Sequence, residues 1–172
     1  MIQIRERDLS ARRLFRLADK AAEIARFKGA RVLVNDRADV AASIEAGVHL
    51  TTRSIPADVV RRAFGAKMLI GASTHSLDEA KAAEQGGADF IVYGPVFETD
   101  SKRIYGPPLG VGELETVASH IQIPVLALGG ISLENFRQVL DAGAAGVAAI
   151  SLFVKADDIS SIVETIKSYG KQ

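Results

Sequence analysis

The sequence contains no cysteine among its 172 residues, which excludes disulfides, thiolate zinc sites and a cysteine nucleophile and fits a cytoplasmic protein. It has no excess of either charge, because 21 basic and 21 acidic residues cancel, so nothing indicates a nucleic-acid partner. It also lacks an apolar run near the roughly 20 residues that span a bilayer, and its first residues do not have the layout of a signal peptide. These absences predict a soluble protein without a membrane partner, in which any anion site is local.

What the sequence does contain is typical of one globular domain, which we expect to cover residues 1–172. The content is 48% hydrophobic and 24% charged. Short β-branched runs alternate with segments of helical period. They are apolar on both alternations, as in a parallel sheet buried on both faces. The expected strands cover residues 1–5, 31–35, 47–50, 67–73, 90–96, 124–130 and 146–151.

The first helix has the clearest pattern. Ser10 is a candidate N-cap, an apolar stripe that includes Leu14 and Leu17 follows, and Gly29 ends the helix. Further helices are expected near 38–46, 57–64, 77–86, 111–120, 133–142 and 157–169. Similar strand–helix units at similar spacing predict an α/β fold of the TIM (β/α)8-barrel type.

Seven units are visible, whereas a closed barrel of this type has eight, so the first β/α unit is apparently lacking. A sheet of seven strands leaves two unpaired edges. We therefore expect either that the natural protein begins further upstream or that neighbouring chains of a homo-oligomer cover the edges.

Motifs at the expected strand ends form an ordered set. In this order the set resembles the thiamine phosphate synthase/TenI family of TIM barrels over nearly the whole chain. The motifs are "QIRERDLS", "VNDRADVA", "GVHL", "GASTHSLDEA", "GADFIVYGPVFETDSK", "PPLGV", "IPVLALGGIS" and "DAGAAGVAAIS".

The resemblance implies one of two activities of thiamine biosynthesis. The synthase branch is a transferase that joins a hydroxymethylpyrimidine diphosphate to a thiazole phosphate and releases diphosphate. The TenI branch includes a tautomerase that aromatises the thiazole phosphate precursor. In either case the expected partners are small phosphorylated heterocycles.

The stretch "QIRER" places Gln3, Arg5 and Arg7 on one side of an expected strand. Guanidinium groups suit a diphosphate because each donates two parallel hydrogen bonds. By resemblance this stretch binds the pyrimidine diphosphate, although the family usually has lysine in place of Arg7. A solvated strand end paired with Glu6 and Asp8 is the alternative.

Asn35 and Asp36 follow the next strand, where a carboxylate can hold Mg²⁺. The resemblance makes Asp36 a metal ligand and places Asn35 at the pyrimidine diphosphate; helix capping by either residue is the alternative. Ser54 stands where the family's second metal-ligating aspartate is expected, with Arg53 beside it. One carboxylate holds Mg²⁺ more weakly than two, and this departure resembles the TenI branch.

Ser73 lies where the family contacts the pyrimidine diphosphate, and His75 after it is a candidate acid or base. His49 is expected to pack in its strand end, and His120 to lie at the surface of a helix end.

The loop after "FIVYGP" carries Thr99, Ser101 and Lys102. By resemblance the first two contact the thiazole phosphate, and Lys102 contacts the diphosphate. Pro95 stands where the TenI tautomerase has a catalytic histidine, and proline cannot transfer a proton. Pro95 therefore favours the synthase.

Gly129 and Gly130 after one strand, and Ile150 and Ser151 after the next, complete a phosphate site in the family. Barrels often build such sites from backbone amides and a helix N-terminus after the last two strands. We expect Arg5, Arg7 and Lys102 to stabilise the departing diphosphate. A non-catalytic thiazole phosphate or thiamine phosphate binding protein is the third reading.

Overall fold

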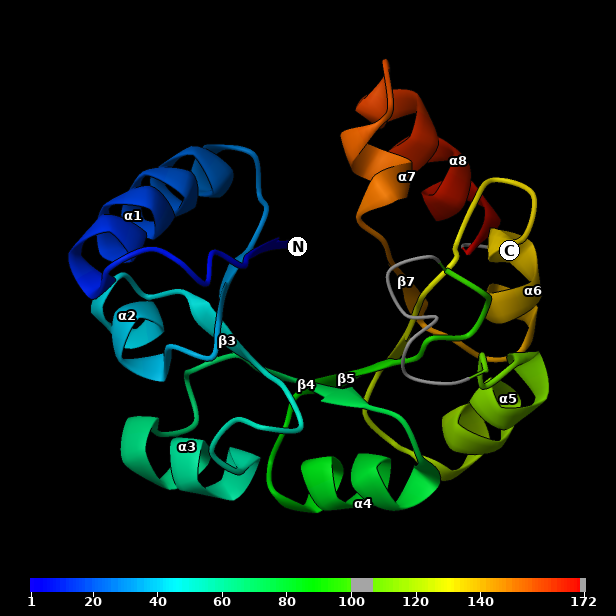
Figure 1. Ribbon diagram of the computed structural model, residues 1–172, viewed down its shortest axis with the longest axis horizontal. Helices are drawn as coiled ribbons and strands as arrows, with labels where there is room; N and C mark the ends of the chain where they lie inside the picture. Colours follow the sequence, from blue (N-terminus) through cyan, green and yellow to red (C-terminus); the bar gives the residue numbers. More distant parts are fainter. Residues whose placement is uncertain (100–106, 171–172) are drawn as a thin grey trace. The chain divides into compact units, whose positions relative to one another are not determined.

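The computed structural model describes residues 1–99 and 107–170 (Figure 1). Strands and helices alternate along the chain, and the strands of each described sheet pairing run parallel. By its internal contacts the chain forms two compact units. Unit 1 comprises residues 1–73 and 83–89, and unit 2 comprises residues 74–82 and 90–172.

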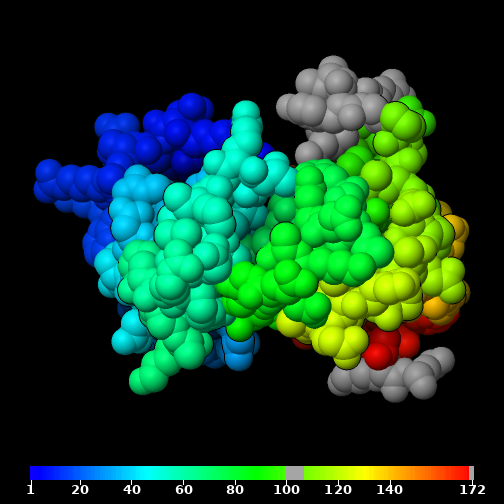
Figure 2. All heavy atoms as spheres, turned by 90° about the horizontal axis from the view of Figure 1, so that it is seen from below, coloured from blue at the N-terminus to red at the C-terminus, as the bar shows by residue number. Residues whose placement is uncertain are grey.

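Unit 1 is built on strands β1 (Ile2–Ile4), β2 (Val32–Asn35), β3 (Gly47–Leu50) and β4 (Ile70–Thr74), whose last residue falls in unit 2. Ile2 pairs with Val32, Leu33 with Gly47, and Val48 with Ile70. Helices α1 (Ala11–Phe27), α2 (Ala38–Ser43) and α3 (Ala57–Phe64) follow the first three strands. Figure 2 shows α3 on the surface of unit 1, where it buries only two residues, Ala57 and Val60.

Unit 2 contains strands β5 (Phe90–Tyr93), β6 (Val125–Leu128) and β7 (Gly146–Ala148). Ile91 pairs with Val125, and Leu126 pairs with Gly146. Helix α4 (Leu77–Gln85) begins in this unit and ends in unit 1. Helices α5 (Val111–His120), α6 (Phe136–Asp141), α7 (Ser151–Val154) and α8 (Ile159–Tyr169) complete the described part.

The predicted seven strands are confirmed in the described residues, with differences at their ends. The strand expected at 67–73 begins only at Ile70, and the one expected at 146–151 ends at Ala148. The short helix α7 was not expected. Burial on both faces holds for β3 and β5, whereas β1 is largely exposed and β7 is half-buried. Each of these two has one paired neighbour in the described residues, so the expectation that something covers the edges stays a prediction.

Two details of the first helix differ from expectation. Leu17 is 42% exposed, so the buried stripe of α1 consists instead of Leu14, Ala18, Ala22 and Ala25. Ser10 is at the N-cap position, but its side chain makes no capping hydrogen bond, and only its carbonyl accepts from the Leu14 amide. Gly29 ends the helix as predicted, with a φ of 64°.

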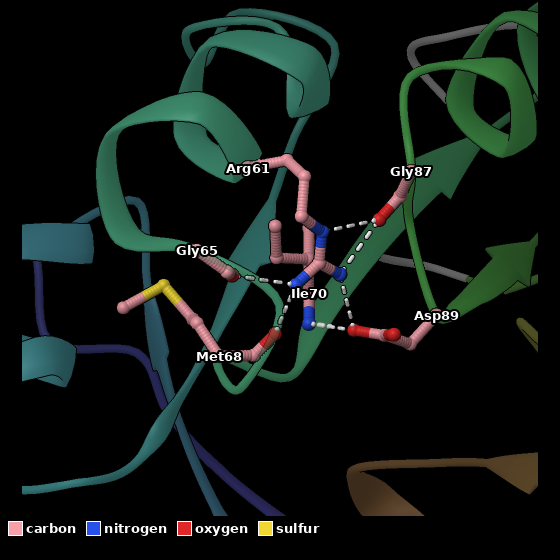
Figure 3. Close-up of polar contacts among 6 residues, drawn as sticks. All are labelled: Arg61, Gly65, Met68, Ile70, Gly87 and Asp89. Atoms are coloured by element: carbon pink, nitrogen blue, oxygen red, sulfur yellow. Dashed lines mark hydrogen bonds and ion pairs between the residues drawn. The ribbon is translucent and has the colours of Figure 1, made fainter.

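The side chain of Arg61 forms hydrogen bonds to several segments of unit 1 (Figure 3). Arg61 donates to the carbonyl oxygens of Gly65 at 3.0 Å, Met68 at 2.7 Å and Gly87 at 2.7 and 3.1 Å. It also pairs with Asp89 at 2.8 Å, and the same Asp89 oxygen accepts from the amide of Ile70. The guanidinium therefore satisfies carbonyls that no strand or helix uses and holds the start of β4 in place.

Among the described residues, no helix is long and apolar enough to cross a bilayer.

Candidate functional site

A chain of hydrogen bonds joins the carboxyl ends of β1 and β2. The Gln3 side-chain amide donates to Asn35 Oδ1 at 2.9 Å, and Asn35 Nδ2 donates to Asp36 Oδ2 at 3.1 Å. Asp36 has a φ of 62°, a left-handed conformation that aspartate tolerates better than most residues. Its carboxylate lies directly beyond the strand, as the sequence predicted.

Ser54 completes the arrangement from the loop after β3. Its hydroxyl donates a short hydrogen bond to Asp36 Oδ1 and accepts one from the amide of Thr51 at 2.6 Å. Both carboxylate oxygens of Asp36 therefore accept hydrogen bonds within the protein. We call Gln3, Asn35, Asp36, Thr51 and Ser54 the Asp36 network.

The helix-capping alternative for Asn35 and Asp36 is wrong. The N-cap position of α2 is occupied by Arg37, and no side chain caps that helix. Arg37 pairs instead with Asp39 through two hydrogen bonds, of 2.8 and 2.6 Å. Capping therefore does not account for the two polar residues at the end of β2.

Arg5 and Arg7 lie beyond the last residue of β1, so they are not on the strand as expected, and both are exposed. Neither forms a salt bridge with another residue of the described chain, so the alternative that they pair with Glu6 and Asp8 is wrong. Their guanidinium groups are accessible to a ligand that binds at the carboxyl ends of the strands of unit 1.

His49 lies in β3 opposite Asn35 and is only 4% exposed. Its Nε2 is 2.8 Å from Ser73 Oγ, at the carboxyl end of the next strand. Burial lowers the pKa of His49 from 6.5 to about 4, and Asp36 opposes that shift. The imidazole is therefore neutral near pH 7 and orients the Ser73 hydroxyl. The packing expected for His49 is confirmed, but its bond to Ser73 was missed.

The depressed pKa of His49 predicts a pH dependence of stability. Below about pH 6.5 the unfolded chain binds a proton at His49, whereas the folded chain does so only near pH 4. Stability is therefore lost as the pH falls, and this group should account for about 2 kcal/mol between pH 7 and pH 5.

Urea unfolding at both pH values measures this loss, with His49→Gln as the control. The glutamine variant should lose less stability over the same interval, by about that amount. An equal loss in both proteins would contradict a buried neutral histidine.

In unit 2, the loop after β5 lies against the loop after β6. The amide of Val96 donates to Leu128 O at 2.8 Å, and the amide of Phe97 donates to Gly129 O at 3.0 Å. A Cβ on Gly129 would lie 2.6 Å from Pro95, and one on Gly130 would lie 2.5 Å from Glu98 O. Both glycines also have positive φ, of 101° and 64°, so the loop contact requires glycine at both positions.

Asn135 supports this glycine turn and was not identified from the sequence. Its Nδ2 donates to Gly130 O at 2.9 Å, and its Oδ1 accepts from the Ser132 amide at 2.8 Å. An asparagine five residues after a glycine pair, just before a helix, is a weak pattern to recognise in a sequence. The Asn135 side chain therefore holds the backbone of the turn in place through these two hydrogen bonds.

The remaining predicted residues of unit 2 are placed unevenly. Thr99 is half-buried at the end of the described part of its loop, whereas Ser101 and Lys102 lie outside the described residues. Ile150 is at the N-cap position of α7, and Ser151 is its first residue, so both follow β7 as expected. The amides of Phe153 and Val154 bond to Ile150 O at 3.1 and 2.9 Å.

His75, the candidate acid or base, is held by one carboxylate. Its Nδ1 is 3.2 Å from Glu79 Oε2, and its amide donates to the same oxygen at 2.7 Å. These contacts lie at the first turn of α4. His120 is exposed at the end of α5, as expected.

The Asp36 network offers a metal ion one carboxylate, that of Asp36. No group of three or more acidic or histidine side chains suited to a metal occurs in residues 1–99 and 107–170. Mg²⁺ often binds through one or two carboxylates, with water and substrate phosphate supplying the other ligands. Asp36 fits that requirement, with the Ser54 hydroxyl competing for one of its oxygens.

Parallel strand–helix units with polar side chains gathered after the strands define the class of TIM-type (β/α) proteins. A solved structure of this class, thiamine phosphate pyrophosphorylase from Pyrococcus furiosus, matches with a TM-score of 0.87 and 33% identity. The match covers 98% of this chain and 81% of that one. A structure titled "Native KDPGal structure" shares the fold at a TM-score of 0.68 and 20% identity, covering 90% of this chain and 77% of that one.

The family model described as thiamine monophosphate synthase (TMP-TENI) matches residues 1–153, and the chain belongs to this family. Relatives that carry the name thiamine-phosphate synthase include the following two. The protein of Chlorobium luteolum is 43% identical over 158 residues, which are 91% of this chain and 74% of that protein. The protein of Moorella thermoacetica is 38% identical over 167 residues, 96% of this chain and 80% of that protein.

Proposed function

We propose that this chain is a thiamine phosphate synthase-like transferase that joins hydroxymethylpyrimidine diphosphate to thiazole phosphate and releases diphosphate. The observation that carries the proposal is the Asp36 network at the carboxyl ends of β1 to β3, in a chain of this family. The proposal includes a single domain over residues 1–172 located in the cytoplasm, with a homo-oligomer as one way of covering the sheet edges.

In unit 1 the proposed ligand is the pyrimidine diphosphate. The exposed guanidinium groups of Arg5 and Arg7 would bind the diphosphate oxygens, each through paired hydrogen bonds. Asn35, fixed by Gln3, and Ser73, oriented by neutral His49, would position the ring. Holding the reacting carbon in place and stabilising the departing negative charge are the two effects that this reaction needs.

In unit 2 the proposed ligand is the thiazole phosphate. Thr99 and Ser101 would contact its phosphate, together with Gly129, Gly130, Ile150 and Ser151. The support is the close approach of the two loops, which leaves backbone groups rather than side chains at the glycine turn. Lys102 would bind the diphosphate leaving group.

Asp36 is the residue proposed to hold Mg²⁺. Mg²⁺ held by this carboxylate would supply positive charge to neutralise the negative charge that develops on the departing diphosphate. Because Ser54 supplies a hydroxyl where a second carboxylate would bind the ion directly, we propose that Mg²⁺ binding is weak without diphosphate.

Ser54→Asp is expected to strengthen Mg²⁺ binding roughly tenfold by adding a second negative ligand. Calorimetric titration of Mg²⁺ into protein saturated with inorganic diphosphate measures the effect without turnover. Thr52→Asp is the matched control, since Thr52 is exposed in the same loop, and the hydrogen bonds to the Asp36 carboxylate come from Asn35 and Ser54 instead. Equal Mg²⁺ affinities in both variants would show that position 54 does not face the ion.

The bond between Ser54 and Asp36 also supports a second candidate, because it satisfies the carboxylate without a metal. That candidate is a TenI-like isomerase of thiazole phosphate or a thiazole or thiamine phosphate binding protein. Pro95, half-buried in the loop after β5, opposes the isomerase because it cannot transfer a proton.

Purified protein should be given both synthase substrates with Mg²⁺ and, separately, the non-aromatic thiazole phosphate precursor. Formation of thiamine phosphate in the first reaction is expected. Aromatisation in the second reaction alone would establish the isomerase instead, and binding of the ligands without turnover in either reaction would establish a binding protein.

A further inference from the structure

A hollow of about 310 Å³ opens in unit 1 at the amino ends of the strands, the opposite end from the Asp36 network. Val32 and Gly47, the first residues of β2 and β3, form part of its lining, and Ala22 of α1 forms another part. A volume of this size holds a small metabolite. Nothing in the proposed reaction uses this end of the strands.

Four charged residues line the hollow, and three of them are cations. They are Arg26, Arg31, Lys67 and the single carboxylate Glu45. None of the four forms a salt bridge within the described chain, whereas Arg37, Arg61 and Arg62 all do. Within the described residues, Arg26 makes one hydrogen bond, from Nη2 to Ile44 O at 2.7 Å. The formal charge around the hollow is therefore positive and unpaired.

The helix ends at the hollow weaken this positive potential without reversing it. Helices α1 and α2 end close by, at Phe27 and Ser43, and each helix C-terminus carries roughly half a negative charge. Two such ends amount to about one negative charge, against three cations and one carboxylate. Arg26 near the end of α1 is partly explained by that helix dipole, but Arg31 and Lys67 lie outside helices.

We call Arg61 and its partners Gly65, Met68, Gly87 and Asp89 the Arg61 cluster (Figure 3), and two of these partners lie on either side of Lys67 in the chain. Arg61 Nη1 binds the carbonyl oxygens of Gly65 and Met68, which flank Lys67 in the chain. These hydrogen bonds therefore hold the backbone around Lys67 in place at the edge of the hollow. A cation on a braced segment loses less conformational entropy when it binds an anion.

Glu45 occupies a backbone conformation that normally belongs to glycine. Helices α1, α4 and α6 each end with a glycine at positive φ, namely Gly29, Gly87 and Gly143, and the next amide bonds back into the helix. Helix α2 ends with the same pattern, in which Ala46 N bonds to Ala41 O at 2.9 Å, yet the residue at positive φ is Glu45. A glutamate is strained in this left-handed conformation. The strain suggests that the Glu45 carboxylate has a role beside the three cations of the hollow.

We propose that this hollow is a second anion site, which binds a small phosphate ester carrying an amino group. Arg26, Arg31 and Lys67 bind the phosphate, for which clustered guanidinium and ammonium groups are suited. Glu45 accepts a hydrogen bond from the amino group and so distinguishes this ligand from a simple phosphate. The site is independent of the proposed transferase reaction.

Two probes that differ only in the amino group test the site, namely phosphoethanolamine and ethyl phosphate. Titration into ¹⁵N-labelled protein at constant ionic strength, followed by amide shifts, should move the signals of Arg31, Ala46 and Gly47 saturably. Phosphoethanolamine should bind roughly fivefold more tightly than ethyl phosphate. In Glu45→Gln this preference should disappear.

The double substitution Arg31→Gln with Lys67→Gln should weaken binding of both probes at least about tenfold. Arg13→Gln with Lys20→Gln is the matched control, since both residues are exposed on α1 away from the hollow and remove the same charge. Shifts confined to the glycine turn at Gly129 and Gly130, or equal weakening in both double variants, would overturn the proposal. A preference for phosphoethanolamine that survives Glu45→Gln would overturn the assigned role of Glu45.

Discussion

Gly94→Ala is expected to destabilise the protein by about 3 kcal/mol or more. Gly94 follows β5, and a Cβ at this position would overlap Leu128 O and lie 2.9 Å from the Leu128 carbonyl carbon. Both atoms belong to the backbone of β6, so no side chain can move aside. The substitution would therefore push apart the two strands from which the loops of unit 2 begin.

The control for Gly94→Ala is the same substitution at Gly112. Gly112 lies in the first turn of α5, and a Cβ there would meet no heavy atom within 4 Å. Gly112→Ala should stabilise the protein by about 0.5 kcal/mol through helix propensity. Urea unfolding of both variants gives the two values, and a loss below about 1 kcal/mol for Gly94→Ala would show that the strands yield easily.

Arg61→Met is expected to cost about 3 kcal/mol of folding stability, the second large effect. The methionine keeps most of the apolar stem but leaves the carbonyl oxygens of Gly65, Met68 and Gly87 without their donor and removes the ion pair with Asp89 (Figure 3). Each partly buried group that loses its hydrogen bond costs about 1 kcal/mol or more. Water reaches some of these groups, because the Arg61 side chain is 22% exposed, and this limits the total.

Arg62→Met removes the same type of residue from the next position of α3 and serves as the control. In the part of the chain that the structure describes, Arg62 has one partner, Asp58, and its side chain is 70% exposed. Its loss should change stability by less than about 0.5 kcal/mol. Similar losses in the two variants, compared by urea unfolding, would contradict a structural role for the Arg61 cluster.

The repeated strand–helix architecture could be predicted because each strand carries its own local pattern. The runs at residues 47–50 and 90–93 are mostly apolar and are buried throughout. The pattern of apolar residues did not predict burial correctly where burial depends on a neighbouring element. Leu17 matches the spacing of the buried stripe of α1 but is 42% exposed. In the end strands, Ile2 of β1 is exposed and Val147 of β7 is only half-buried, although both residues are apolar.

The site could be predicted as far as it consists of residues at strand ends. Asp36, Ser54 and the glycine pair lie after strands, as their sequence positions imply, and Asn35 is the last residue of β2. Contacts between distant residues could not be predicted in the same way. The Ser73 partner of His49 and the carbonyl bound by Asn135 depend on strand register and loop geometry, which single residues do not reveal.

The anion site at the amino ends of the strands is a further example. Arg26, Arg31, Glu45 and Lys67 come from separate segments and become neighbours only through the parallel pairing of β2, β3 and β4. The positive φ of Glu45 could not be predicted from the local sequence. The glycine expected at a helix end comes two residues later, at Gly47, which is already part of the next strand.

The central claim is that this chain joins a pyrimidine diphosphate to a thiazole phosphate. The most direct test quantifies diphosphate and thiamine phosphate together when the purified protein is given both substrates and Mg²⁺. We predict that the two products appear in equal amounts and that Asp36→Asn lowers the rate by roughly a hundredfold. Diphosphate release without thiamine phosphate, or no release at all from folded protein, would contradict the claim.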